Sequence, residues 1–224
     1  MIHILSLDIT IKKYTLSRTH VLKTPYLRNQ GEEHLNALIH AIGLGLSIAG
    51  LGCLVSLTVY QGWMVHAAAV IFGVTMSMTY LTSTLYHGNE DPIKRRRYRM
   101  LDHVSIYTAI AGGYTPLTLL CVPYPKGIII FSVIWILAGI GIIYKIRNLG
   151  KNEFLSSAGY VGLGWCGLVM IPDLIETLPG LAGEWILAGG ISYTLGVYFY
   201  WRDYKRFYHT IWHVFTMIGS LCHF

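Results

Sequence analysis

Two histidines, His209 and His213, lie four residues apart inside an apolar segment at the C-terminal end of the sequence. Residues at this spacing share one face of a helix, one turn apart, and two neutral imidazoles placed in this way can bind one metal ion. Ionisable side chains are costly within a bilayer, so histidines in such a segment are candidates for a function. Because the chain has ten histidines, a pair at this spacing can also arise by chance.

A second pair with the same spacing, Ser83 and His87, ends an earlier apolar segment, and Asp102 begins the next one. The Ser83 hydroxyl could hydrogen-bond a water molecule or a substrate carbonyl oxygen, or it could bond a backbone carbonyl of its own helix. Asp102 could serve as a general base beside a metal-bound water, or it could cap the N-terminus of its helix. The pairs would form one site only if the fold brings them together.

The composition indicates a membrane protein. Of the 224 residues, 54% are hydrophobic and only 12% are charged, whereas a soluble domain carries about 25% charged residues. Apolar stretches long enough to cross a bilayer as helices predict an all-α, seven-transmembrane helix bundle. The expected spans are 36–60, 63–87, 102–122, 127–144, 154–171, 184–201 and 208–224.

The basic residues follow the expected loops. All of the 17 Lys and Arg residues except Lys126 fall in the N-terminal tail or in the loops after the second, fourth and sixth spans. These loops alternate, so they lie on one side, and positively charged loops stay in the cytoplasm. We therefore expect residues 1–35 to form a cytoplasmic tail, residues 36–224 to form the transmembrane domain, and the C-terminus to lie outside. The net charge of +6 then reflects topology rather than a nucleic-acid partner.

This orientation places the candidate residues at one depth in the membrane. Ser83 and His87 end the second span, Asp102 begins the third, and His209 and His213 begin the seventh, all at the cytoplasmic side. Three imidazoles and one open position form a common catalytic zinc site. We expect His87, His209 and His213 to bind Zn²⁺, with Asp102 and Ser83 as catalytic groups beside it.

His40 enters from the same side, in the first span. It could hold a metal ligand in place by a hydrogen bond, or it could be a core histidine whose polar atoms are satisfied by other groups. The neighbour of Asp102, His103, is expected to face elsewhere, at the membrane interface. The four cysteines all fall within spans and are expected to be packing residues.

Further residues join these groups in an ordered set of motifs: Glu33, Asn36 and His40; Ser83-Thr-Leu-Tyr-His87; Asp102-His103; Ile106-Tyr107; Gly113-Tyr-Thr-Pro116; and His209-Thr-Ile-Trp-His213. In this order they resemble the haemolysin III proteins, a bacterial branch of the progestin and adipoQ receptor family. The resemblance covers about residues 30–224.

The resemblance implies seven helices, a cytoplasmic N-terminus and a zinc ion held by the three histidines, with Asp102 and Ser83 at the positions of the family's acid and serine. Relatives among the adiponectin receptors are linked to hydrolysis of ceramide, a lipid amide. Bacterial relatives carry the haemolysin name and are linked to permeabilisation or homeostasis of membranes. The N-terminal tail is shorter here than in the animal receptors.

Two functions are consistent with these observations. The first is a zinc-dependent hydrolase of a lipid amide in the bacterial inner (plasma) membrane, with membrane lipids as partners. The second is a non-catalytic membrane-homeostasis factor, receptor or pore-forming haemolysin in which zinc is structural.

Overall fold

The computed structural model describes residues 29–224, so most of the expected cytoplasmic tail lies outside the described residues. Every regular element in this part of the chain is a helix. The helices are α2 (Gln30–Thr58), α3 (Trp63–His87), α4 (Pro92–Pro116), α5 (Lys126–Arg147), α6 (Glu153–Trp165), α7 (Ile171–Thr177), α8 (Ala182–Trp201) and α9 (Tyr208–His223).

Five helical segments are long and apolar enough to cross a membrane. They are α2, α3, α4 with its C-terminal extension, α5, and the run from α6 to α7. Of the other two, α9 has 16 residues, and α8 has 20 residues that include several Tyr and Gly. The protein is thus all-helical and spans the membrane more than once, and the count of seven spans stays a prediction.

The surface of the bundle supports this assignment. On α2, Leu38, Ile42 and Leu46 recur every four residues and are more than half exposed. On α5, Ile129 and Ile136 are exposed to a similar extent. An apolar face of this length suits contact with lipid.

The helix α4 begins ten residues before the expected span. The Asp91 carboxylate caps its N-terminus by accepting the backbone N–H groups of Ile93 and Lys94 at 2.8 and 3.0 Å. Pro92 occupies the first turn, where its missing N–H costs nothing. The basic run 94–99 is therefore helical rather than a loop. Asp102 lies in the helix interior, so the alternative that it caps this helix is wrong.

Two helical segments change pitch near their far ends. After Pro116, which has no N–H to donate, α4 continues as a π-helix over Leu117–Cys121. The segment α6 continues through a 3₁₀ turn, Cys166–Met170, into α7. Asp173 and Glu176, which follow the expected span 154–171, therefore lie in a helix, α7.

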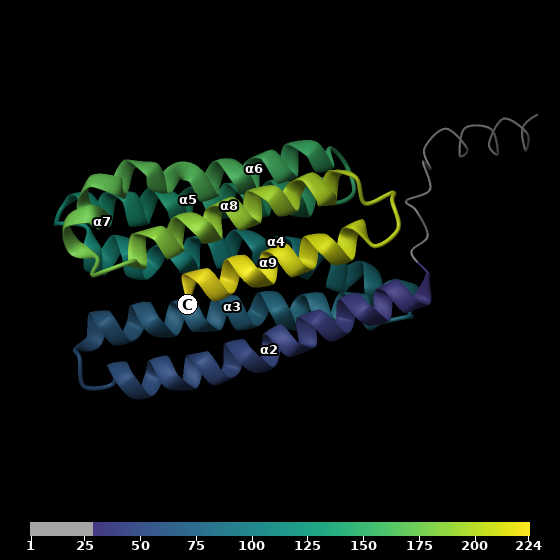
Figure 1. Ribbon diagram of the computed structural model, residues 1–224. Helices are drawn as coiled ribbons and strands as arrows, with labels where there is room; N and C mark the ends of the chain where they lie inside the picture. The colour runs from purple at the N-terminus through teal and green to yellow at the C-terminus, as the bar shows by residue number, and fades with distance from the viewer. Residues whose placement is uncertain (1–28) are drawn as a thin grey trace, which may run out of the picture.

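The helices lie side by side and alternate in direction, so that segments far apart in the sequence meet (Figure 1). The α2–α3 and α8–α9 pairs pack closely, α4 packs on α3 and α5, and α9 also contacts α2. In Figure 1, α9 lies between the α2–α3 pair and α8. The start of α2, the end of α3 and the start of α9 consequently meet at one end of the bundle, which we call the basic end. All Lys and Arg residues of the described chain except Lys126 lie there.

Close approach of α3 and α4 holds the middle of the bundle together. Ala68 on α3 and Ala111 on α4 are fully buried, and a Cβ added at Gly112 would overlap Thr75 on α3. Next to it, a Cβ at Gly113 would have no atom within 4 Å. Small residues at one helix face thus set the distance between these helices.

We expect Gly112→Ala to destabilise the protein by about 1–3 kcal/mol through overpacking. The matched control is Gly113→Ala, which should be stabilising by up to about 1 kcal/mol because Ala favours helix over Gly. Thermal unfolding of both variants in detergent micelles measures the difference. Equal midpoints for the two variants would contradict the packing of α3 on α4.

Candidate metal centre

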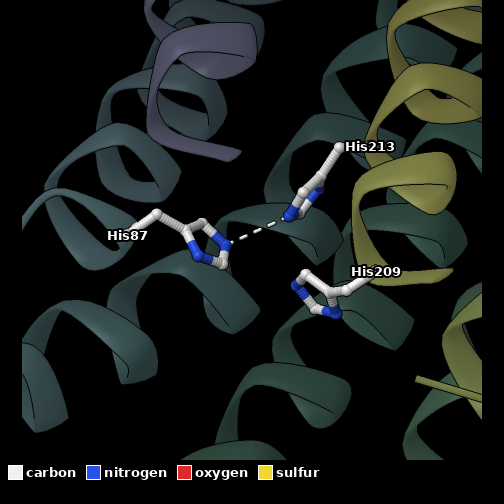
Figure 2. Close-up of side chains that lie close together, drawn as sticks. All are labelled: His87, His209 and His213. Atoms are coloured by element: carbon white, nitrogen blue, oxygen red, sulfur yellow. Dashed lines mark hydrogen bonds between the residues drawn. The ribbon is translucent and has the colours of Figure 1, made fainter. Parts of the chain in front are cut away.

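Three buried imidazoles converge at the basic end of the bundle (Figure 2). His87 is the last residue of α3, and His209 and His213 lie in the first two turns of α9. One ring nitrogen from each lies within 4.8 Å of the others, and the Nε2 atoms of His87 and His213 are 3.1 Å apart. The structure therefore brings together the two motifs that the sequence placed at one depth.

Glu33 on α2 holds the His87 ring. The His87 Nδ1 lies 2.6 Å from Glu33 Oε2, and the other carboxylate oxygen lies 2.7 Å from Arg95 Nη2. A carboxylate at Nδ1 accepts its N–H and leaves the Nε2 lone pair directed at the shared centre. Metal-binding histidines are commonly oriented in this way.

His40 holds the ring of His213. Its Nε2 lies 2.7 Å from His213 Nδ1, and the two ring centroids are 4.2 Å apart in an edge-to-face arrangement. Of the two sequence interpretations, this geometry favours the one in which His40 positions a metal ligand. For the third imidazole, Asp203 Oδ2 lies 3.6 Å from His209 Nδ1.

The same face of α2 fixes the start of α9. Phe207, just before α9, has a positive φ of 62°, which is unfavourable for a bulky residue. Its N–H donates to Glu32 Oε1 at 3.1 Å, and the Thr210 hydroxyl donates to Asn36 Oδ1 at 2.6 Å. Glu32 was not among the residues predicted to support the site. The polar residues at positions 33, 36 and 40, within an otherwise apolar helix, could have predicted this polar face of α2.

Asp102 is buried in the interior of α4. Its Oδ2 lies 3.5 Å from His103 Nδ1. His103 is itself buried, and its Nδ1 donates to the Arg99 carbonyl at 2.8 Å. His103 was expected to face away from the bundle, but it is buried, because α6 packs on this part of α4 and the Tyr160 hydroxyl donates to the His103 carbonyl at 3.0 Å.

Ser83 differs from the other hydroxyls of its helix. Its side chain is buried, and its Oγ has no hydrogen-bond partner within the described residues. The other Ser and Thr side chains of α3 all donate to carbonyls of their own helix, namely Thr75, Ser77, Thr79, Thr82 and Thr84. The geometry therefore favours the interpretation in which Ser83 serves a ligand.

Buried side-chain atoms that lack a hydrogen bond belong to residues next to the cluster: His40 contacts His213, Asn36 contacts Thr210, and Ser83 lies one turn before His87. Across residues 29–224 these atoms are Ser83 Oγ, His40 Nδ1 and Asn36 Nδ2. Buried polar groups are rarely left unpaired, and exceptions call for a water, an ion or a function. The donor set also fits a metal ion, since three neutral imidazoles with oriented rings are ligands that zinc accepts. The cluster can thus hold a metal, with polar atoms available for a further molecule.

The fold and this cluster define a multi-pass, all-helical integral membrane protein with a buried histidine site at one end. The sequence profile described as "Haemolysin-III related" matches residues 29–224. The chain belongs to the haemolysin III family.

Two similar proteins come from bacteria. Hemolysin-3 of Bacillus cereus is 38% identical over 190 residues, which are 84% of this chain and 87% of that protein. A Hemolysin-3 homolog of Bacillus subtilis (strain 168) is 35% identical over 195 residues, 86% of this chain and 91% of that protein.

We expect Glu32→Ala to destabilise the protein by about 1–3 kcal/mol, because it leaves the Phe207 N–H without its acceptor. The exposed Glu176 on α7 provides the matched control, and Glu176→Ala should stay within about 0.5 kcal/mol of the wild type. Thermal unfolding in micelles reports both. If the two variants lose the same stability, Glu32 does not fix the start of α9.

Proposed function

We propose that this protein is an integral membrane zinc enzyme that hydrolyses a lipid amide similar to ceramide. The supporting observation is that the orphaned atoms Ser83 Oγ, His40 Nδ1 and Asn36 Nδ2 belong to residues that contact α9 or lie one turn from a ligand of the buried three-histidine cluster. A purely structural zinc site is usually closed by a fourth protein ligand. Here the surrounding groups are better suited to a water molecule and a substrate.

His87, His209 and His213 would hold the ion through ring nitrogens that converge within 4.8 Å. When bound, zinc supplies Lewis acidity that makes water a nucleophile near neutral pH. Glu33 and His40 keep two of the rings oriented through their Nδ1 contacts. These contacts allow the ligands to remain in place without rearrangement during turnover.

Asp102 and Ser83 would act on the substrate. The buried Asp102 carboxylate is the base candidate for removing a proton from the attacking water and returning it to the leaving amine. The Ser83 hydroxyl can donate to the amide carbonyl oxygen, where negative charge develops. A lipid amide reaches such a site from within the bilayer, and its carbonyl then lies at the depth of α3's last turn.

The distribution of charge supports an orientation for this site. With the basic end in the cytoplasm, the N-terminus lies inside and, if α8 and α9 also cross the membrane, the C-terminus lies outside. The candidate site then lies near the cytoplasmic face of the bacterial inner (plasma) membrane, where cytoplasmic water is close.

A second function is favoured by the names of the relatives, which are called Hemolysin-3. In this alternative the zinc ties α3 to α9 as a structural clamp, and the protein permeabilises membranes or acts in membrane homeostasis without catalysis. The unpaired Ser83 hydroxyl and the buried Asp102 carboxylate favour the hydrolase, because a clamp needs neither.

Zinc content tests the ligand set. The purified wild type should carry about one zinc per chain, and His213→Ala should lose most of it because two imidazoles bind zinc far more weakly than three. The control is His34→Ala, an exposed histidine on α2, which should retain the metal. Elemental analysis by plasma mass spectrometry measures all three. Equal zinc in wild type and His213→Ala would refute the assignment.

Fatty-acid release from ceramide-like amides tests catalysis. Asp102→Asn should lower kcat by roughly 10²–10⁴-fold, the usual contribution of a general base, while its zinc content stays at the wild-type level. Ser83→Ala should also release fatty acid more slowly than the wild type. Ser77→Ala should release it at the wild-type rate, because the Ser77 hydroxyl donates to the Gly73 carbonyl of its own helix. A zinc-loaded wild type that releases no fatty acid would favour the structural clamp.

A further inference from the structure

A second polar centre lies on the other side of the basic end, among α4, α5, α6 and α8. Lys145 at the end of α5 is fully buried, and its Nζ lies 2.7 Å from Glu153 Oε2. The Tyr200 hydroxyl donates to the same oxygen at 3.0 Å, and Arg99 Nη2 lies 3.4 Å from Glu153 Oε1. Ionisable groups inside a membrane protein commonly mark a functional site, and the proposed hydrolysis uses none of these four.

A cavity of about 420 Å³ adjoins this centre and shares Arg99, Glu153 and Tyr200 with it. This volume lies within the range of small-molecule sites. Three helices and two loops supply its walls. The lining residues are Arg99, Gly150, Glu153, Phe154, Tyr200, Trp201 and Asp203.

The cavity lies beside the ends of two helices. It is formed where α6 begins and α8 ends, at the basic end of the bundle. The rings of Phe154 and Trp201 pack 5.1 Å apart beside it, and both side chains are about half exposed or more. Aromatic rings and basic residues together are typical of the boundary between bilayer and water.

The walls of the cavity carry charges of both signs, with the Arg99 guanidinium on α4 and the Asp203 carboxylate in the turn after α8. The Arg99 guanidinium projects from α4, where the contact with Glu153 leaves other N–H groups of the fork for an acceptor. The Asp203 carboxylate and the rings of Trp201 and Tyr200 come from α8 and the turn after it. A guanidinium binds phosphate well, and aromatic faces beside a carboxylate suit an ammonium group.

The geometry points to a binding site for the headgroup of a zwitterionic phospholipid, with the phosphate at Arg99 and the ammonium at Trp201 and Asp203. A purely anionic headgroup would face the Asp203 carboxylate, and a purely cationic ligand would face Arg99. Glu153 is already held by Lys145 and Tyr200, so its part is to orient the guanidinium. This inference does not depend on the proposed hydrolase or on zinc.

The site lies next to the candidate metal centre. Asp203 Oδ2 is 3.6 Å from His209 Nδ1, and the Tyr200 and His209 ring centroids are 6.1 Å apart. A lipid headgroup in the cavity therefore lies one side chain away from a candidate metal ligand, on the side opposite α2.

Native mass spectrometry of the purified protein, titrated with phospholipids of identical acyl chains, tests the inference. Phosphatidylethanolamine and phosphatidylcholine should each bind at one saturable site, at least about tenfold more tightly than phosphatidylglycerol, since one charge-assisted hydrogen bond accounts for such a factor. Equal affinity for all three lipids, or tightest binding of phosphatidylglycerol, would overturn the inference.

Matched variants locate the site. Arg99→Gln should weaken binding of phosphatidylethanolamine about tenfold, and Arg96→Gln, an exposed arginine one turn away on α4, should leave it unchanged. If Arg99→Gln does not fold, a second pair of variants makes the same comparison. Trp201→Leu should weaken binding of phosphatidylethanolamine, and Trp185→Leu should leave it unchanged, because Trp185 is exposed at the other end of α8. The inference fails if each variant matches its control.

A chelated sample separates this inference from the proposed function. After zinc is removed, the preference for zwitterionic lipids should persist, because the lining residues are not metal ligands. Loss of the preference on chelation would contradict a site built by Arg99 and Trp201.

Discussion

The structure depends on the need to satisfy both nitrogens of each imidazole away from water. A buried imidazole with an unpaired nitrogen is costly, and three such rings meet at one end of this bundle. Their outer nitrogens are met by Glu33, His40 and Asp203. The helix α2 supplies two of these three partners. Its polar face at the basic end is therefore required by the imidazoles of α3 and α9 that it contacts. The same face explains why α2 must contact α9, which is far from it in sequence.

Much of the candidate site could be predicted from the sequence, because helical spacing and the alternation of basic loops both have simple physical causes. The four-residue spacing of His209 and His213 fixed their shared face, and the charge pattern fixed their depth relative to His87. The resemblance to the haemolysin III family was confirmed over residues 29–224.

The remaining features depend on tertiary contacts. The start of α4 was predicted too late because Lys and Arg, which mark the edge of a membrane, also form helix readily. Glu32 and Glu33 lie in the first turn of α2, where acidic residues are favoured by the helix dipole in any case. Only the fold shows that one reaches the Phe207 amide and the other reaches His87. The burial of His103 follows from the packing of α6 on α4, where the Tyr160 hydroxyl donates to the His103 carbonyl.

One consequence follows from the place of α9 in the chain. His87 and its partner Glu33 are synthesised early, whereas His209 and His213 are on a helix that follows α4 to α8. During biosynthesis, Glu33 can therefore pair with His87 and Arg95 before α9 is made, whereas the Nε2 atom of His40 gains its contact with His213 only when α9 follows. The three-histidine cluster can form only after α9 has left the ribosome and inserted. The cluster thus joins the first two helices of the described chain to the last one, and a chain interrupted before α9 would leave His40 without its partner His213.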